Sequence, residues 1–213
     1  IAEHVDLEEF ENQARDDLER FESIRSPWVS QSYAWIAAIL MLRGDLEGSL
    51  RHADVAIDLE PASAWTGLAW SYKFLALAMA GDLETCRTLL SEQRGLLPQA
   101  GEAATIGRTT MLFAAAQGCV ILGLAEDAAA LYPLVAERVD VLPVGAVDLV
   151  LAQRIAGMTA AAAGRWDQAQ AHFEVATRQS DEFPNRLERP QVLHWYGKML
   201  LDRANADDHE RAR

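Results

Sequence analysis

The stretch Gly44-Asp45-Leu46-Glu47 decides the fold, because it returns unchanged as Gly81-Asp82-Leu83-Glu84, a shift of 37 residues (44 to 81). The same shift relates further matching pairs: Pro61 and Pro98, Tyr33 and Trp70, Trp35 and Tyr72, and Leu40 and Leu77. Self-similarity at a fixed period is the signature of a repeat protein. Each repeat is expected to contain a long apolar helix, a Gly-Asp turn, a second helix and a proline.

The chemistry of these residues suits a helical hairpin. Gly44 supplies the backbone freedom that a tight turn between two helices requires. Asp45 can accept hydrogen bonds from the free amides that open the second helix. Pro61 ends that helix, because proline lacks an amide proton and restricts the residue before it. One hairpin cannot bury its apolar face alone, so we expect the hairpins to stack.

Looser repeats follow, with turns at Gly123 and Gly164, and a helix over Val192–Arg203. Before the first repeat, Val5–Arg25 is predicted to be an amphipathic helix. We therefore predict an all-α fold: a right-handed α-solenoid of antiparallel hairpins that forms one domain over 1–213. Its predicted units are 1–26 (half a hairpin), 27–61, 62–98, 102–143, 145–184 and 188–213 (incomplete).

Composition and charge narrow the classes of function. Half of the 213 residues are hydrophobic, and alanine is abundant among them, which favours closely packed helices. With 32 acidic against 19 basic residues, the formal charge of −13 argues against direct binding of nucleic acid. Two cysteines, Cys86 and Cys119, are too few for a disulfide framework, so we expect buried thiols and a cytoplasmic location.

No apolar run is long enough for a membrane helix, and the acidic first 25 residues do not resemble a signal peptide. Asp207 and Glu210 have the spacing of a capping box, which predicts another helix start close to the end of the sequence. A helix there needs more chain to pack against. We interpret the sequence as a segment of a larger protein.

The spacing of Gly, Ala, Phe and Pro resembles tetratricopeptide repeats over nearly the whole chain. The stretch Ala163-Gly164-Arg165-Trp166-Asp167-Gln168-Ala169, with Phe173 and Ala176, resembles the closing repeats of large bacterial regulators, as does Trp195-Tyr196-Gly197-Lys198-Met199. Those regulators are LuxR-type transcription factors and adenylate-cyclase-like proteins with an ATPase domain. The resemblance implies an ATPase domain and an output domain fused to this segment, neither of which its sequence contains.

The inner, concave face of such a stack is lined by the first helix of each hairpin. Counting from the turn glycines, we predict that the binding residues on this face are Gln31, Met41, Ser71, Phe113, Gln117, Arg154 and Met158. The face is apolar with a few polar groups, which suits a protein or small-ligand partner. Arg154 is the group expected to meet an acidic ligand. The alternative is that neighbouring helices or a second copy of the chain fill the face.

Other candidate sites are explained more simply. The stretch from Gly101 to Thr109 imitates a phosphate loop, but its glycines are one residue too far apart and Arg108 stands where lysine is needed, which favours a plain loop and helix start. The histidines lack ligand partners at helical spacing, and no nucleophile motif is present, so we predict no metal, cofactor or catalytic site. Trp70 and Trp166 are predicted to pack between helices, whereas Trp28 and Trp65 could be exposed anchors for a partner.

Three functions are compatible with this pattern. The favoured one is a repeat segment of a cytoplasmic bacterial regulator that binds a protein or ligand and relays that event to the fused domains. The second is a scaffold or homo-oligomerisation module with no ligand of its own. The third, an enzyme on a helical ring, requires clustered carboxylates or histidines facing a cavity, and Arg154 alone does not supply them.

Overall fold

The computed structural model describes residues 7–144, 150–182, 187–205, 208 and 212. These residues form ten α-helices and one short 3-10 helix, with no strand among them beyond a single bridge between Val144 and Leu151. The fold is therefore all-α, as predicted. The chain divides into two compact units, one ending at Leu122 and one running from Gly123, and they are described separately as the N-terminal and C-terminal units. A single domain over 1–213 stays a prediction.

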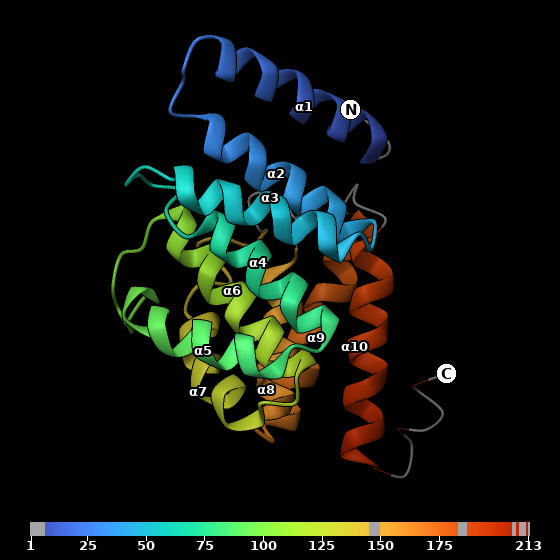
Figure 1. Cartoon of the computed structure of the whole chain (residues 1–213). Coiled ribbons are helices and arrows are strands. Elements are labelled where there is room, and N and C mark those ends of the chain that lie inside the picture. Colours follow the sequence, from blue (N-terminus) through green and yellow to red (C-terminus); the bar gives the residue numbers. More distant parts are fainter. Residues whose placement is uncertain (1–6, 145–149, 183–186, 206–207, 209–211, 213) are drawn as a thin grey trace. The chain divides into compact units, whose positions relative to one another are not determined.

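The N-terminal unit contains six α-helices, which can be followed by their labels in Figure 1. They are α1 (Leu7–Ser23), α2 (Val29–Leu42), α3 (Leu46–Leu59), α4 (Leu68–Ala80), α5 (Leu83–Gln93) and α6 (Ile106–Ile121), with the 3-10 helix η1 (Arg94–Leu96) after α5. Helix α2 packs against α1, α3 and α4, and α4 also packs against α3, α5 and α6. The first helices of successive hairpins (α2, α4 and α6) are thus neighbours, while α3 fits against both α2 and α4.

The C-terminal unit contains α7 (Ala125–Ala136), α8 (Ala152–Ala162), α9 (Trp166–Glu182) and α10 (Glu188–Arg203). Helix α8 is at its centre and contacts α7, α9 and α10, while α9 also packs against α10. Phe173 of α9 is fully buried and stacks on Tyr196 of α10 with 5.4 Å between the ring centroids. On its other side, Phe173 approaches Gly157 of α8 so closely that an added Cβ there would lie 2.9 Å from the ring.

The helix boundaries agree closely with those expected from the sequence. The amphipathic helix predicted from Val5 begins at Leu7 in the described residues, and its apolar side chains pack against α2 around Ala14 and Ile36. The helix predicted from Val192 begins four residues earlier, at Glu188. Part of the predicted unit 145–184, and both Asp207 and Glu210 of the predicted capping box, lie outside the described residues.

The predicted turn chemistry is confirmed. The four turn glycines all have left-handed backbones: φ is +83° at Gly44, +78° at Gly81, +71° at Gly123 and +68° at Gly164. The carboxylate of Asp45 accepts a hydrogen bond from the amide of Gly48 at 2.8 Å, and that of Asp82 accepts one from Thr85 at 3.1 Å. These bonds satisfy amide groups that have no partner within the helix.

Of the two prolines predicted to end second helices, Pro61 does so directly, whereas α5 ends at Gln93 and the 3-10 helix η1 separates it from Pro98. Helix α3 ends at Leu59, and Glu60 adopts an extended backbone before Pro61. The Glu60 carboxylate then reaches across the connection and accepts a hydrogen bond from the Gly67 amide at 3.1 Å, at the start of α4. Burial raises the pKa of Glu60, and the hydrogen bonds from the backbone of Gly67 and Ala69 oppose that increase. The end of one hairpin therefore caps the beginning of the next.

A fifth turn occurs at a residue that the sequence pattern did not identify. Ala204 follows α10 with φ +54° and ψ +36°, the left-handed conformation found at the turn glycines. Arg203 beside it donates two hydrogen bonds to the buried Asp208 (2.6 and 2.8 Å) and one to Gln170 of α9 (2.8 Å). These bonds hold the turn against α9. The left-handed residues that come just after a helix, from Gly44 to Ala204, therefore recur at intervals of about 40 residues, a spacing typical of helical-hairpin repeats.

This turn allows a test of the backbone argument. A residue with a Cβ pays roughly 1–2 kcal/mol to adopt the left-handed conformation, whereas glycine does not. We expect Ala204→Gly to raise the free energy of unfolding by about 1 kcal/mol, measured by urea denaturation. Gly44→Ala is the matched reverse change, because an added Cβ there meets no atom within 4 Å. It should lower stability by a similar amount. A destabilised Ala204→Gly variant would contradict the assignment of this turn.

Candidate functional site

The structure places the predicted concave-face residues of the N-terminal unit on three adjacent helices. Gln31 and Met41 are on α2, Ser71 is on α4, and Phe113 and Gln117 are on α6. The first four are buried and Gln117 is half-buried. The Ser71 hydroxyl donates a hydrogen bond to the Gly67 carbonyl at 2.7 Å, within its own helix. Four of these five side chains are therefore core residues rather than an open lining, and a binding face on these helices stays a prediction.

Two exposed apolar side chains lie near the C-terminal ends of α2 and α4. Leu42 is 36% exposed and Met79 is 49% exposed. They hold the same place in successive repeats, two residues before Gly44 and Gly81. Because α2 and α4 pack together, this pair occupies the turn end of two neighbouring first helices. The 37-residue shift relates Leu42 to Met79, but neither residue lies on the predicted inner face.

In the C-terminal unit, the predicted site residue Arg154 forms a buried ion pair. Its side chain is 2% exposed, and its Nε donates to the carboxylate of Glu188 at 2.7 Å; the Glu188 side chain is 4% exposed. Glu188 also accepts from the Leu151 amide at 2.9 Å, and a second Arg154 nitrogen lies 3.4 Å from the sulfur of Met158. The acidic group that Arg154 meets thus belongs to the chain itself. Arg154 and Met158 lie one turn apart on α8.

The residue before Arg154 begins a second polar cluster. The Oε1 atom of Gln153 lies 2.7 Å from Nδ1 of His172 on α9, and Nε2 of the same ring lies 3.2 Å from the hydroxyl of Tyr132 on α7. The guanidinium of Arg165 lies over the Tyr132 ring, 5.2 Å from its centroid. Burial lowers the pKa of His172 and raises that of Tyr132.

Two consecutive residues of α8 are therefore linked by polar contacts to three other helices. Gln153 is linked to α9 and, through His172, to α7, while Arg154 is linked to α10. The sequence predicts no ligand role for His172, and the structure shows that its ring is half-buried and bridges helices. Its partners lie 19 and 40 residues away in the sequence, so local spacing gave no signal of this contact.

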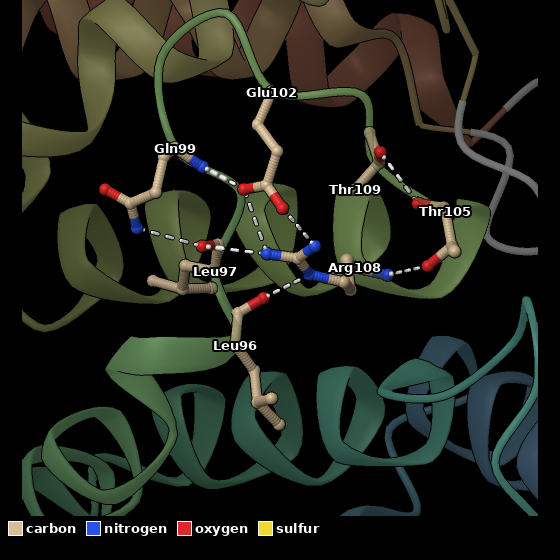
Figure 2. A network of polar contacts seen from close by, with 7 residues as sticks. All are labelled: Leu96, Leu97, Gln99, Glu102, Thr105, Arg108 and Thr109. Atoms are coloured by element: carbon tan, nitrogen blue, oxygen red, sulfur yellow. Dashed lines mark hydrogen bonds and ion pairs between the residues drawn. The ribbon is translucent and has the colours of Figure 1, made fainter.

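The stretch that imitates a phosphate loop is a clamped connection, as predicted. Figure 2 shows the Arg108 guanidinium between the carbonyl oxygens of Leu96 and Leu97 and the carboxylate of Glu102. Its Nε donates to Leu96 at 2.7 Å, and its terminal nitrogens donate to Glu102 at 2.6 and 3.1 Å. Glu102 also accepts from the Gln99 amide at 2.8 Å. Arg108, which stands where a phosphate loop has lysine, is bonded to groups of the same connection.

The remaining candidate reactive groups are potential metal-ligating side chains and the two cysteines. No group of three or more potential metal-ligating side chains occurs in the part of the chain that is described. Cys86 and Cys119 are both buried, as predicted. Burial and the charge of Asp82 raise the pKa of the Cys86 thiol to about 11, so this sulfur is protonated at neutral pH and is a poor nucleophile.

The tryptophans divide largely as expected. Trp70 is buried and stacks on Phe74 with 4.8 Å between ring centroids, which confirms its core position. Trp166 and Trp65 are half-buried, and Trp28 is exposed by 48%. Over the described residues, no helix combines the length and apolar character needed to cross a bilayer.

Comparison of the chain with protein-family models, with curated proteins and with solved structures found no match.

The buried ion pair gives a direct test of what Arg154 does. Removing one partner of such a pair leaves a buried charge alone and typically costs about 3–5 kcal/mol, whereas replacing both can be nearly neutral. We expect Arg154→Met to lower the free energy of unfolding by that amount. Adding Glu188→Gln to it should recover much of the loss, because the amide oxygen still accepts from Leu151. Urea denaturation of the single and double variants provides the measurement.

The exposed pair between Arg189 and Asp181 is the matched control. Both side chains are more than half exposed, so Arg189→Met should cost at most about 1 kcal/mol. If Arg154→Met and Arg189→Met lower the free energy of unfolding equally, the buried pair does not stabilise the fold more than the exposed one, and the structural role of Arg154 is contradicted.

Proposed function

We propose that this chain is a tetratricopeptide-like helical-repeat segment of a cytoplasmic bacterial signalling or transcriptional regulator. In this proposal it binds a protein or ligand and relays that event to fused ATPase and output domains. The recurrent hairpins, the acidic surface and the resemblance of the last third to LuxR-type and adenylate-cyclase-like regulators support it.

The observation that carries this proposal is the recurrence of one turn geometry. Gly44, Gly81, Gly123, Gly164 and Ala204 are all left-handed, and each follows a helix. Repeated hairpins whose first helices pack against one another bury each other's apolar faces and present an extended surface. Such surfaces usually serve recognition. The described clusters, by contrast, hold no paired acid and nucleophile.

The geometry favours a protein over a small anionic ligand as the partner. Arg154, the cation that the sequence offers to such a ligand, is neutralised by Glu188, and Arg108 is neutralised by Glu102. Leu42 and Met79 are accessible apolar side chains on two neighbouring first helices. Apolar side chains at the ends of rigid helices can act as anchors for a partner protein. A partner that binds there contacts α2 and α4 together and can shift one hairpin relative to the next.

The alternative function, a scaffold or oligomerisation module, is favoured by a different observation. Gln31, Met41, Ser71 and Phe113, which should line an open groove, are buried. When the predicted inner face is buried in this way, less of it remains accessible to a ligand. In that case the exposed Leu42 and Met79 serve contacts between copies of the chain.

Light scattering separates the two functions. If the chain binds a different protein, we expect a monomer whose mass does not change with protein concentration. If it is an oligomerisation module, the mass rises with concentration, and Leu42→Glu with Met79→Glu returns it to the monomer. Val55→Glu is the matched control, since Val55 is also an exposed apolar residue, on α3. An oligomer that the Leu42 and Met79 substitutions dissociate would overturn the leading proposal.

The relay to fused domains is tested by the reading frame around this segment. We expect it to encode a phosphate-loop ATPase domain before the repeats and a cyclase or helix-turn-helix domain in the same protein. A frame that encodes only helical repeats would contradict the relay and favour the scaffold.

A further inference from the structure

One titratable side chain joins three helices of the C-terminal unit. The imidazole of His172 projects from α9 and is engaged at both nitrogens. Nδ1 lies 2.7 Å from the Gln153 side-chain oxygen on α8, and Nε2 lies 3.2 Å from the Tyr132 hydroxyl on α7. The imidazole and phenol rings meet edge to face, with their centroids 5.9 Å apart. Three separate stretches of sequence therefore depend on one ring.

These contacts define the protonation state of the ring. The oxygen of Gln153 can only accept, so Nδ1 carries the proton and donates it. In the neutral ring Nε2 is then an acceptor, and the Tyr132 hydroxyl must donate to it. The neutral Nδ1–H tautomer thus satisfies both neighbours at once. A histidine free in water is held to neither arrangement.

A second proton on the ring changes one of these contacts. Protonated Nε2 becomes a donor, so the Tyr132 hydroxyl has to turn its oxygen toward the ring and find another acceptor for its own proton. The new positive charge also arises beside a tyrosine whose ring already holds the Arg165 guanidinium. Both changes weaken the link from α7 to α9, while the bond from Nδ1 to Gln153 persists.

The other elements packed around α9 bring no negative charge to the ring through the contacts observed. From α8 the facing group is the neutral amide of Gln153, and from α7 it is Tyr132. Helix α10 meets the residue next along α9 through Tyr196, and its Arg203, which reaches Gln170, is bound by Asp208. Arg165 is the charged side chain that these contacts place in the cluster.

We propose that His172 is a proton-sensitive latch of the C-terminal unit: its neutral ring joins α7 and α8 to α9, and protonation of Nε2 reverses the hydrogen bond with Tyr132 and so weakens the link from α7 to α9.

The direction of the pKa shift agrees with this geometry. Burial lowers the pKa of His172 below its ordinary value of 6.5, so the unfolded chain takes up a proton at a higher pH than the folded chain does. The stability that the neutral ring provides is complete above pH 6.5. It is lost as the pH falls from there toward the lowered pKa of the folded protein.

The first experiment measures the protonation state of the His172 ring directly in the 213-residue chain. Nitrogen-15 NMR of the imidazole, recorded across a pH titration, reports both the tautomer and the pKa of His172. We expect the Nδ1–H tautomer at neutral pH and a pKa below 6.5. An Nε2–H tautomer, or a pKa at or above 6.5, would overturn the proposal.

The second experiment uses a variant in which protonation of His172 should strengthen the cluster instead of weakening it. Gln153→Glu places a carboxylate against Nδ1, and an opposite charge at that distance raises a histidine pKa by about one unit or more, a tenfold change in proton affinity. In this variant, protonation should strengthen the cluster. The difference in urea midpoint between about pH 7.5 and about pH 5.5 should therefore shrink relative to the original protein.

Two further variants control for general effects of pH. His172→Gln removes the titrating group and should also reduce the difference in midpoint. His194→Gln alters an exposed histidine of the same unit and should leave the difference unchanged. An equal pH dependence in the original protein, His172→Gln and Gln153→Glu would show that the ring is only a packing element.

Discussion

The constraint on which the rest of the structure depends is the left-handed residue that follows the first helix of a hairpin. At that point the chain must reverse within three residues, and only a positive φ permits the reversal while the next helix begins with its cap in place. Gly44 and Asp45 show the pairing clearly: the glycine turns the backbone, and the aspartate receives the first free amide of α3. Since the turn fixes how α2 and α3 leave it, it also fixes which side chains they bury. The contacts of α4 with α2, α3 and α6 follow from repeating that arrangement.

These turns explain why much of the fold could be predicted from the sequence. Glycine, aspartate and proline act through their own backbones and nearest neighbours, so their effects are local and appear in the order of residues. Pro61, for example, follows an extended Glu60, and α3 ends at Leu59. Ala204 shows the limit of this reasoning, because alanine is normally a helix-forming residue. Its left-handed backbone accompanies the contacts of the adjacent Arg203 with Asp208 and Gln170, the latter 33 residues away.

The candidate site was harder to predict, for a related reason. Periodicity identifies which helix a residue belongs to, and Gln31, Ser71 and Arg154 do lie on first helices. It does not identify what covers them. Arg154 is neutralised by a glutamate 34 residues away, and His172 is held by contacts with a glutamine and a tyrosine on two other helices. A polar residue on an apolar helix can equally indicate a binding face or an internal bond. Only the position of its partner distinguishes these, and a single sequence does not contain that position.

The polar residues of α8 therefore perform a task that apolar packing cannot. Alanine-rich helices slide and rotate against one another at little cost, because small side chains interlock weakly. A bond with one geometry, such as that between Arg154 and Glu188, allows only one register of α8 against α10. Gln153 and His172 impose the same restriction on α8 and α9. A unit built this way has few arrangements available, and a change at one bond alters a whole helix rather than a single side chain. That property is compatible with the proposed relay of a binding event to fused domains.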